Sequence, residues 1–170
     1  MNTSKLRRVL AALGLAVLAG GLAPVASAEP ASQPVSAAVT VHVTGVVNMH
    51  IQDYETVLPN EDCYFTQPVD FFWSSNSGTA KFIMVGHCGG EVRVEVDHLY
   101  NVSNDGVLHV HAVGRLYEGA NSHDTTDLNG TNDQWFSIPS GGAPDLSSLA
   151  LHNTDEGHDW AFIDFQLTTR

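Results

Sequence analysis

Residues 91–117 read EVRVEVDHLYNVSNDGVLHVHAVGRLY, and apolar and polar side chains alternate on both sides of Asn104-Asp105-Gly106. Successive side chains of a β-strand point to opposite faces, so this period of two predicts two half-buried strands. Gly106 can adopt the left-handed conformation that a three-residue hairpin loop requires. The stretch therefore predicts an antiparallel hairpin.

The length of the hairpin loop decides which residues of the two strands face one another. A three-residue loop pairs Ser103 with Val107, and the numbers of opposed residues then sum to 210. A two-residue loop would place Arg115 opposite Val96 and mix the faces, which burial of one face disfavours. The preferred register gives an apolar face with Val94, Val96, His98, Tyr100 and Val102 opposite Leu116, Gly114, Ala112, Val110 and Leu108.

The other face of the hairpin is polar, and its register predicts two cross-strand pairs. Glu95 lies opposite Arg115, which favours an ion pair. Arg93 lies opposite Tyr117, which favours a cation–π contact. Both pairs would support the three-residue loop from the solvent side.

Short alternating stretches recur along the chain, and turn residues separate them. The candidate strands are 39–51, 63–73, 80–87, 91–102, 107–117, 134–138, 149–152 and 160–168. No stretch has a helical period over a helical length, and no apolar run after the N-terminal segment could span a membrane. The pattern predicts an all-β fold, an antiparallel β-sandwich of about eight strands in a jelly-roll-like arrangement.

The first 28 residues have the composition of a secretory signal peptide. Lys5, Arg7 and Arg8 precede an apolar run at 9–18, and Ala26-Ser27-Ala28 fits a cleavage site. We therefore expect an extracellular protein that is cleaved near Ala28.

Cleavage would leave a flexible lead-in at 29–38 and a single domain at 39–170. Of the seven lysines and arginines, four remain against all 19 acidic residues, so the net charge becomes −15 with histidine neutral. Nucleic acid and anionic membranes are poor partners for such a chain, because phosphate binding needs clustered basic residues.

Cys63 and Cys88 are the two cysteines of the chain. In an exported protein such a pair predicts a disulfide. The strands at 63–73 and 80–87 are expected to form a hairpin, whose antiparallel pairing would bring both cysteines to one end. A disulfide that closes a loop of this span should stabilise the fold by about 3.5 kcal/mol, because it lowers the entropy of the unfolded chain.

The acidic residues gather at one end of the predicted sandwich. If every connection reverses the chain, the loops at the end of Cys63 contain Asp53, Glu55, Glu61, Asp62, Glu118, Asp124, Asp127, Asp133, Asp155, Glu156 and Asp159. The opposite loops contain Asp105 and Asp145. Crowded carboxylates repel one another, and a calcium ion with its oxygen ligands relieves that repulsion.

Calcium is accordingly the expected cofactor. The predicted metal ligands are Asp124, Asp127, Asn129, Asp133, Asp155, Glu156 and Asp159. Neither acidic segment matches an EF-hand loop, and solvated acidic turns explain the same composition. Acidic loops at one end of an antiparallel sandwich resemble the architecture of C2 domains, which implies a C2-like arrangement of strands.

Two further groups of residues are candidate binding sites. His109 and His111 lie on one strand face with Asp97 diagonal to His111, a pattern that suits zinc or copper but also a solvent-facing polar strand. A sugar-stacking surface or ordinary core packing would account for the aromatic residues Trp73, Trp135, Trp160, Tyr54 and Tyr64.

The chain contains no G-x-S-x-G, H-E-x-x-H, P-loop or S-x-x-K motif. We expect a secreted, non-enzymatic binding or interaction module, stabilised by calcium at its acidic end, with a protein or glycan partner. A carbohydrate-binding module is the second hypothesis. A small hydrolase is the third, with a carboxylate pair drawn from Asp53, Glu55, Asp155 and Asp159.

Overall fold

The computed structural model describes residues 37–55, 58–119, 125–142, 145–155 and 158–170. These residues form β1 (Thr40–Asp53), β2 (Glu61–Ser74), β3 (Ala80–Cys88), β4 (Val92–Val102), β5 (Leu108–Glu118), β6 (Asp127–Ile138), β7 (Asp145–His152) and β8 (Trp160–Thr169). Within these ranges no helix has the length and apolar character needed to cross a membrane.

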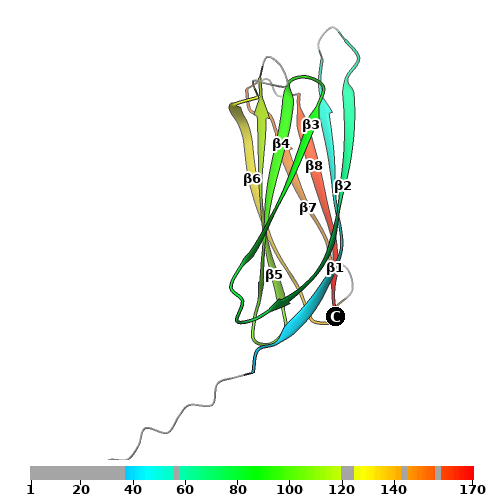
Figure 1. Ribbon diagram of the computed structural model, residues 1–170. Helices are drawn as coiled ribbons and strands as arrows, with labels where there is room; N and C mark the ends of the chain where they lie inside the picture. The colour runs from blue at the N-terminus through cyan, green and yellow to red at the C-terminus, as the bar shows by residue number, and fades with distance from the viewer. Residues whose placement is uncertain (1–36, 56–57, 120–124, 143–144, 156–157) are drawn as a thin grey trace, which may run out of the picture. The chain divides into compact units, whose positions relative to one another are not determined.

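The strands form two four-stranded antiparallel sheets that pack face to face (Figure 1). Sheet A has the order β2-β1-β8-β7, and sheet B has the order β3-β4-β5-β6. The chain changes sheet between β2 and β3 and again between β6 and β7. The predicted antiparallel β-sandwich is confirmed.

The hairpin of β4 and β5 has the predicted register. The Ser103 N–H donates to the Val107 carbonyl at 3.0 Å. Gly106 has a φ of 83°, the left-handed conformation that the three-residue loop requires. Alternate residues such as Val94 and Val96 are buried against sheet A, so the apolar face is the inner face.

The polar face of this hairpin confirms one predicted pair and corrects the other. The Arg93 guanidinium lies 4.3 Å from the centroid of the Tyr117 ring, as the cation–π prediction requires. Glu95 is opposite Arg115, but its Oε1 is 2.9 Å from Arg93 Nη1. Arg115 Nη1 lies instead 3.1 Å from Asp97 Oδ2. Long side chains reach diagonal neighbours on a sheet, so an opposed register does not fix the ion pair.

Two strands are longer than the sequence pattern indicates. β6 begins at Asp127 rather than at residue 134, and β7 begins at Asp145 rather than at residue 149. β6 is an edge strand, and most of its residues are exposed on both faces. Main-chain pairing with β5 holds it in place, so alternation of apolar residues is a poor guide to its extent.

Cys63 and Cys88 form the predicted disulfide, with Cα atoms 5.5 Å apart. The predicted hairpin between their strands is wrong, because β2 pairs with β1 in sheet A while β3 pairs with β4 in sheet B. The connection between β2 and β3 is an arch from one sheet to the other. The disulfide therefore ties the two sheets together at the end where β2 begins and β3 ends.

The core lies between the two sheets and is built from their inward-facing side chains. Tyr100 and Phe165 are the largest fully buried residues, one from each sheet. Residues of β1, β4, β5 and β8 supply most of the remaining apolar core. With these side chains inside, the alternate residues of the same strands form two outer faces.

Candidate functional site

The outer face of sheet A combines exposed aromatic rings with polar groups and has no fixed positive charge. The four strands of this sheet contain no lysine or arginine. Tyr64 of β2 is 72% exposed and Phe162 of β8 is 40% exposed. Phe72 of β2 is also exposed. This face therefore suits a ligand that has apolar surface and no negative charge.

Side chains from β1 and β8 hold the Tyr64 ring in place. His50 of β1 stacks on Tyr64, with ring centroids 4.2 Å apart. The rings of His50 and Trp160 are edge-to-face, with centroids 4.7 Å apart. The His50 Nε2 lies 2.8 Å from Asp62 Oδ1, and the Trp160 Nε1–H donates to Gln52 at 2.8 Å. Tyr64 is therefore an ordered ring on the surface.

This cluster follows from the register of β1 and β2. His50 is directly opposite Tyr64, and Asp62 precedes Tyr64 by two residues, so all three share the outer face. Stacked rings and a hydrogen-bonded imidazole then lock one another's rotamers. The same arrangement recurs at His42 with Asp70 and Phe72 on sheet A, and at His111 with Asp133 and Trp135 on sheet B.

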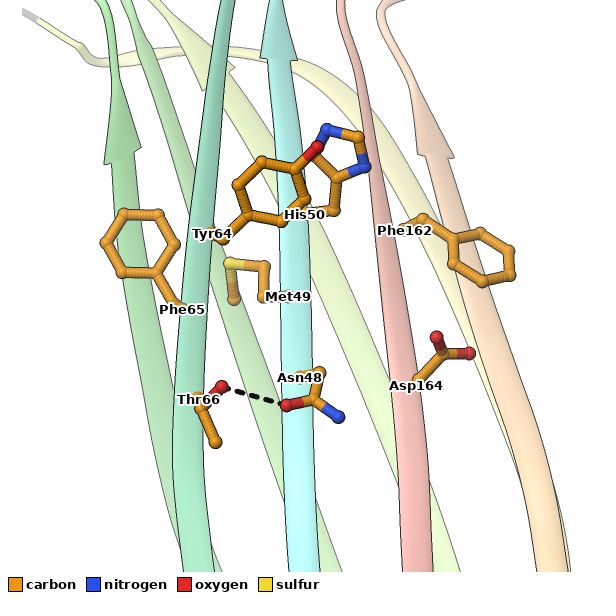
Figure 2. A pocket seen from close by; sticks show the side chains of 8 residues that line it. All are labelled: Asn48, Met49, His50, Tyr64, Phe65, Thr66, Phe162 and Asp164. Atoms are coloured by element: carbon orange, nitrogen blue, oxygen red, sulfur yellow. Dashed lines mark hydrogen bonds between the residues drawn. The ribbon is translucent and has the colours of Figure 1, made fainter.

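A groove of about 300 Å³ lies next to this cluster. Figure 2 shows the Tyr64 ring of β2 beside His50 of β1 and the Phe162 ring of β8 directed toward β7, with Asn48, Thr66 and Asp164 farther along β1, β2 and β8. The Thr66 hydroxyl donates to Asn48 Oδ1 at 2.9 Å, drawn as the dashed line. This bond turns the Asn48 Nδ2 away from Thr66, toward β8. Two rings and a set of hydrogen-bonding groups thus line one groove.

Two of the five aromatic residues named from the sequence meet at this groove or beside it, namely Tyr64 and Trp160. Trp73 packs against the core, as the core-packing alternative expected. Trp135 is exposed on sheet B, on the other side of the sandwich. Tyr54 lies beyond the end of β1. The aromatic residues therefore do not form one continuous surface.

Phe162 and Asn48 are site residues that the sequence reasoning missed. The alternation of Ala161 and Ile163 as inward residues already implies that Phe162 faces outward. Asn48 follows the buried Val47 in the same way. The alternation of inward and outward residues along each strand already placed both residues on the outer face. Nothing in the sequence, however, paired β8 with β1.

The predicted calcium ligands lie in different places. Asp124 and Glu156 fall outside the described residues. Asp127 is exposed at the start of β6. Asp133 lies farther along β6, not in a loop, and its Oδ2 is 3.2 Å from His111 Nε2. The early start of β6 thus takes Asp133 away from the other acidic residues.

Other predicted ligands form a hydrogen-bonded cluster at the acidic end. Asn129 Nδ2 donates to Glu118 Oε2 at 2.8 Å. Asn153 Nδ2 donates to the same Glu118 oxygen and to Asp159 Oδ2, the latter at 3.2 Å. Asp159 Oδ1 accepts the Tyr54 N–H at 2.8 Å. Amide and main-chain donors therefore satisfy these carboxylates.

Asp155 is exposed, and its N–H donates to the Asn153 side chain at 2.8 Å. Across the described ranges, no three or more His, Cys, Asp and Glu residues are grouped so that they could hold a metal ion. Calcium binding by the acidic loops, three of which include residues outside those ranges, stays a prediction.

The histidine pair of β5 has separate partners. His111 contacts Asp133, and His109 Nδ1 lies 2.8 Å from the Ser137 hydroxyl. Asp97, the predicted third group, forms ion pairs with Lys81 and Arg115. Burial acts to raise the pKa of Asp97, but the hydrogen bonds and positive charges of Lys81 and Arg115 together outweigh it and hold that pKa below its usual range. The three predicted groups do not converge.

Asp53 is the most unusual carboxylate of the acidic end. It ends β1 facing inward, 3% exposed, and its Oδ2 has no hydrogen-bond partner among the described residues. Burial, followed by the negative charges of Asp159 and Glu55, raises the pKa of Asp53 from 3.8 to about 7. The parity of β1 predicts this position, because Met49 and Ile51 before it are inward residues.

We expect Asp53→Asn to stabilise the protein at pH 8 and to have little effect at pH 4. The folded state keeps the Asp53 proton up to about pH 7, whereas the unfolded chain releases it near its ordinary pKa of 3.8. The free energy of unfolding therefore falls as the pH rises between these values, by at most about 1.4 kcal/mol per pH unit. Denaturation of both proteins between pH 4 and pH 8 measures the difference.

Asp127→Asn is the matched control, because its carboxylate is exposed at the start of β6. His98, whose pKa is lowered to about 4 by burial, titrates over the same range in every protein compared and so cancels in the difference. Parallel stability profiles for the wild type and Asp53→Asn would show that Asp53 is ionised in the folded state.

Comparison with protein-family models, with curated proteins and with solved structures finds no match for this chain.

Proposed function

We propose that this protein is an exported, non-enzymatic module that binds neutral carbohydrate in the groove on the outer face of sheet A. One observation carries the proposal: two exposed rings, Tyr64 and Phe162, flank β1 beside the polar side chains Asn48, Thr66 and Asp164. A sugar ring has an apolar C–H face and a polar rim, and this groove offers both kinds of partner.

The chemistry of each group fits that occupant. The Tyr64 ring is held by His50, so a sugar ring can stack on it without ordering a mobile side chain. Asn48 Nδ2 is a donor and the Asp164 carboxylate is an acceptor, which together suit vicinal hydroxyl groups. The centres of protein interfaces are enriched in arginine and depleted of aspartate, whereas this face has no arginine and carries Asp62, Asp70 and Asp164.

The charge of the face restricts the class of glycan. Sheet A has no lysine or arginine, whereas Asp62, Asp70 and Asp164 are on its outer face. Sulfated and uronic-acid glycans would meet uncompensated negative charge there. Neutral glycans carry no such penalty.

Two features support an extracellular, non-catalytic role. The Cys63–Cys88 disulfide agrees with an oxidising compartment, and so does the signal-like N-terminal sequence. Of the carboxylates considered for a hydrolase, Asp53 and Asp159 are both buried, and Asp159 accepts hydrogen bonds from Tyr54 and Asn153. Binding is therefore favoured over hydrolysis.

The proposal is tested by glycan-array binding followed by calorimetric titration of the best neutral glycan. We expect binding to neutral but not to anionic glycans. Tyr64→Ala should weaken it at least about tenfold, which corresponds to about 1.4 kcal/mol. The altered side chain is exposed, so the melting temperature should change little.

Trp135→Ala is the matched control. Trp135 is also an exposed ring stacked on a histidine, with centroids 3.8 Å apart, but it lies on sheet B. The Trp135→Ala variant should bind the glycan with unchanged affinity. Equal losses from the two variants, or none from Tyr64→Ala, would contradict the proposed site.

A further inference from the structure

A second cavity, separate from the groove, opens between the two sheets. It measures about 150 Å³ and lies where edge strand β2 faces edge strand β3. Residues 67–71 of β2 line it, together with Phe82 of β3 and His98 of β4. It is reached from the side of the sandwich, whereas the groove lies on its outer face.

Two buried polar atoms on residues that line this cavity lack a hydrogen-bond partner among the described residues. They are Gln67 Oε1 and His98 Nε2. His98 is 1% exposed, and its other ring nitrogen lies 2.7 Å from the hydroxyl of Tyr100. A buried polar group without a partner costs stability, and two of them beside one cavity indicate an occupant that pairs with both.

The protonation states of these groups define the occupant's charge. Burial lowers the pKa of His98 to about 4, and burial also raises the pKa of Tyr100, so both side chains are neutral at pH 7. If the Tyr100 O–H donates to His98 Nδ1, then His98 Nε2 carries the ring proton and is a donor. Gln67 Oε1 is an acceptor. A hydroxyl group can accept from one and donate to the other.

Pro68 and Asp70 complete the β2 side of the wall, and the remaining side chains are apolar and set the size. Val69 is buried, and the rings of Phe71 and Phe82 have centroids 4.9 Å apart. A buried apolar cavity of about 150 Å³ is large enough to bind one benzene ring. The cavity thus matches a single six-membered ring in volume.

We infer that this cavity is a binding site for a small neutral molecule, one six-membered ring in size, that carries a hydroxyl group. The ring would lie against Phe71, Phe82 and Val69. Its polar group would pair with Gln67 and His98. The site does not depend on glycan binding to sheet A.

Phenol and toluene are the probes, since they share a ring and differ in the hydroxyl group. Titration of the isotope-labelled protein at pH 7, followed by the ring signals of His98, measures both affinities. We expect saturable phenol binding that shifts the His98 signals, and toluene binding at least about tenfold weaker. No His98 shift up to about 50 mM phenol, or equal affinities for the two probes, would overturn the inference.

Gln67→Leu removes the acceptor at similar volume and should weaken phenol at least about fivefold without weakening toluene. Gln166→Leu is the matched control, because Gln166 is exposed on β8 in the same sheet, and it should leave both affinities unchanged. Val69→Phe fills the cavity and should abolish binding of both probes. Unchanged phenol affinity in Gln67→Leu would overturn the inference, whether or not Val69→Phe folds.

Discussion

Val96→Asp is expected to lower the free energy of unfolding by about 3 to 5 kcal/mol, because it leaves an unpaired charge in the core. Val96 is fully buried on the inner face of β4, opposite Gly114 of β5. Among the described residues, the buried ones include no lysine or arginine, and burial lowers the pKa of His98, two residues along the same face, to about 4. The total free energy of unfolding of most domains is only about 5 to 15 kcal/mol, so the variant should unfold at a much lower urea concentration.

The controls use the neighbouring positions. Val85→Asn introduces a polar side chain on the outer face of β3, where the residue is exposed, and Glu95→Gln removes a surface charge next to Val96. Each should cost only about 0 to 1 kcal/mol. Equal tolerance at residues 95 and 96 would mean that the assigned inner and outer faces of β4 are reversed.

Removal of the disulfide should have the next largest effect. The bridge spans 25 residues, so opening it should lower the free energy of unfolding by about 3.5 kcal/mol, less any strain in the native bond. The measurement is urea denaturation of the native protein, of the reduced protein, and of the Cys63→Ala, Cys88→Ala double variant. The reduced and substituted proteins should agree.

Intact mass is the control for the state of the cysteines, since the native protein should be two hydrogens lighter than the reduced one. Two alkylatable thiols in untreated protein would show that the bond is absent. Identical denaturation midpoints with and without reductant would show that the tie between the sheets adds no stability.

The hairpin of β4 and β5 was predictable because its information is local. Alternation of Val94, Val96 and their neighbours defines one face, and Gly106 defines the loop. The disulfide was also predictable, but for an incomplete reason. The sequence shows that Cys63 and Cys88 can meet at one end, and both a hairpin and an arch between sheets satisfy that condition.

The choice of partner strand could not be read from the sequence. β1 pairs with β2 on one side and with β8, the last strand of the chain, on the other. That second pairing brings Phe162 and Asp164 beside Asn48 and so builds the groove. Parity assigns each residue to a face, whereas only the strand order shows which outward residues are neighbours.

The acidic end shows the same limit. Reversal of the chain at each connection places most carboxylates at one end, yet it does not show that Asn153 links Glu118 to Asp159. The same reasoning does not distinguish Asp133 from the other acidic residues, although Asp133 lies within the extended β6 and away from that end. The spacing of acidic residues therefore overstated how many ligands could converge.

The central claim is that the outer face of sheet A binds neutral carbohydrate, and its most direct test is a nuclear magnetic resonance titration of the labelled protein with the neutral glycan that binds best on the array. The main-chain and side-chain signals of Asn48, Tyr64 and Phe162 should shift together and saturate with one dissociation constant. The signals of His111 and Trp135 on sheet B should stay unchanged. Shifts confined to sheet B, or the absence of saturable shifts on sheet A, would contradict the account.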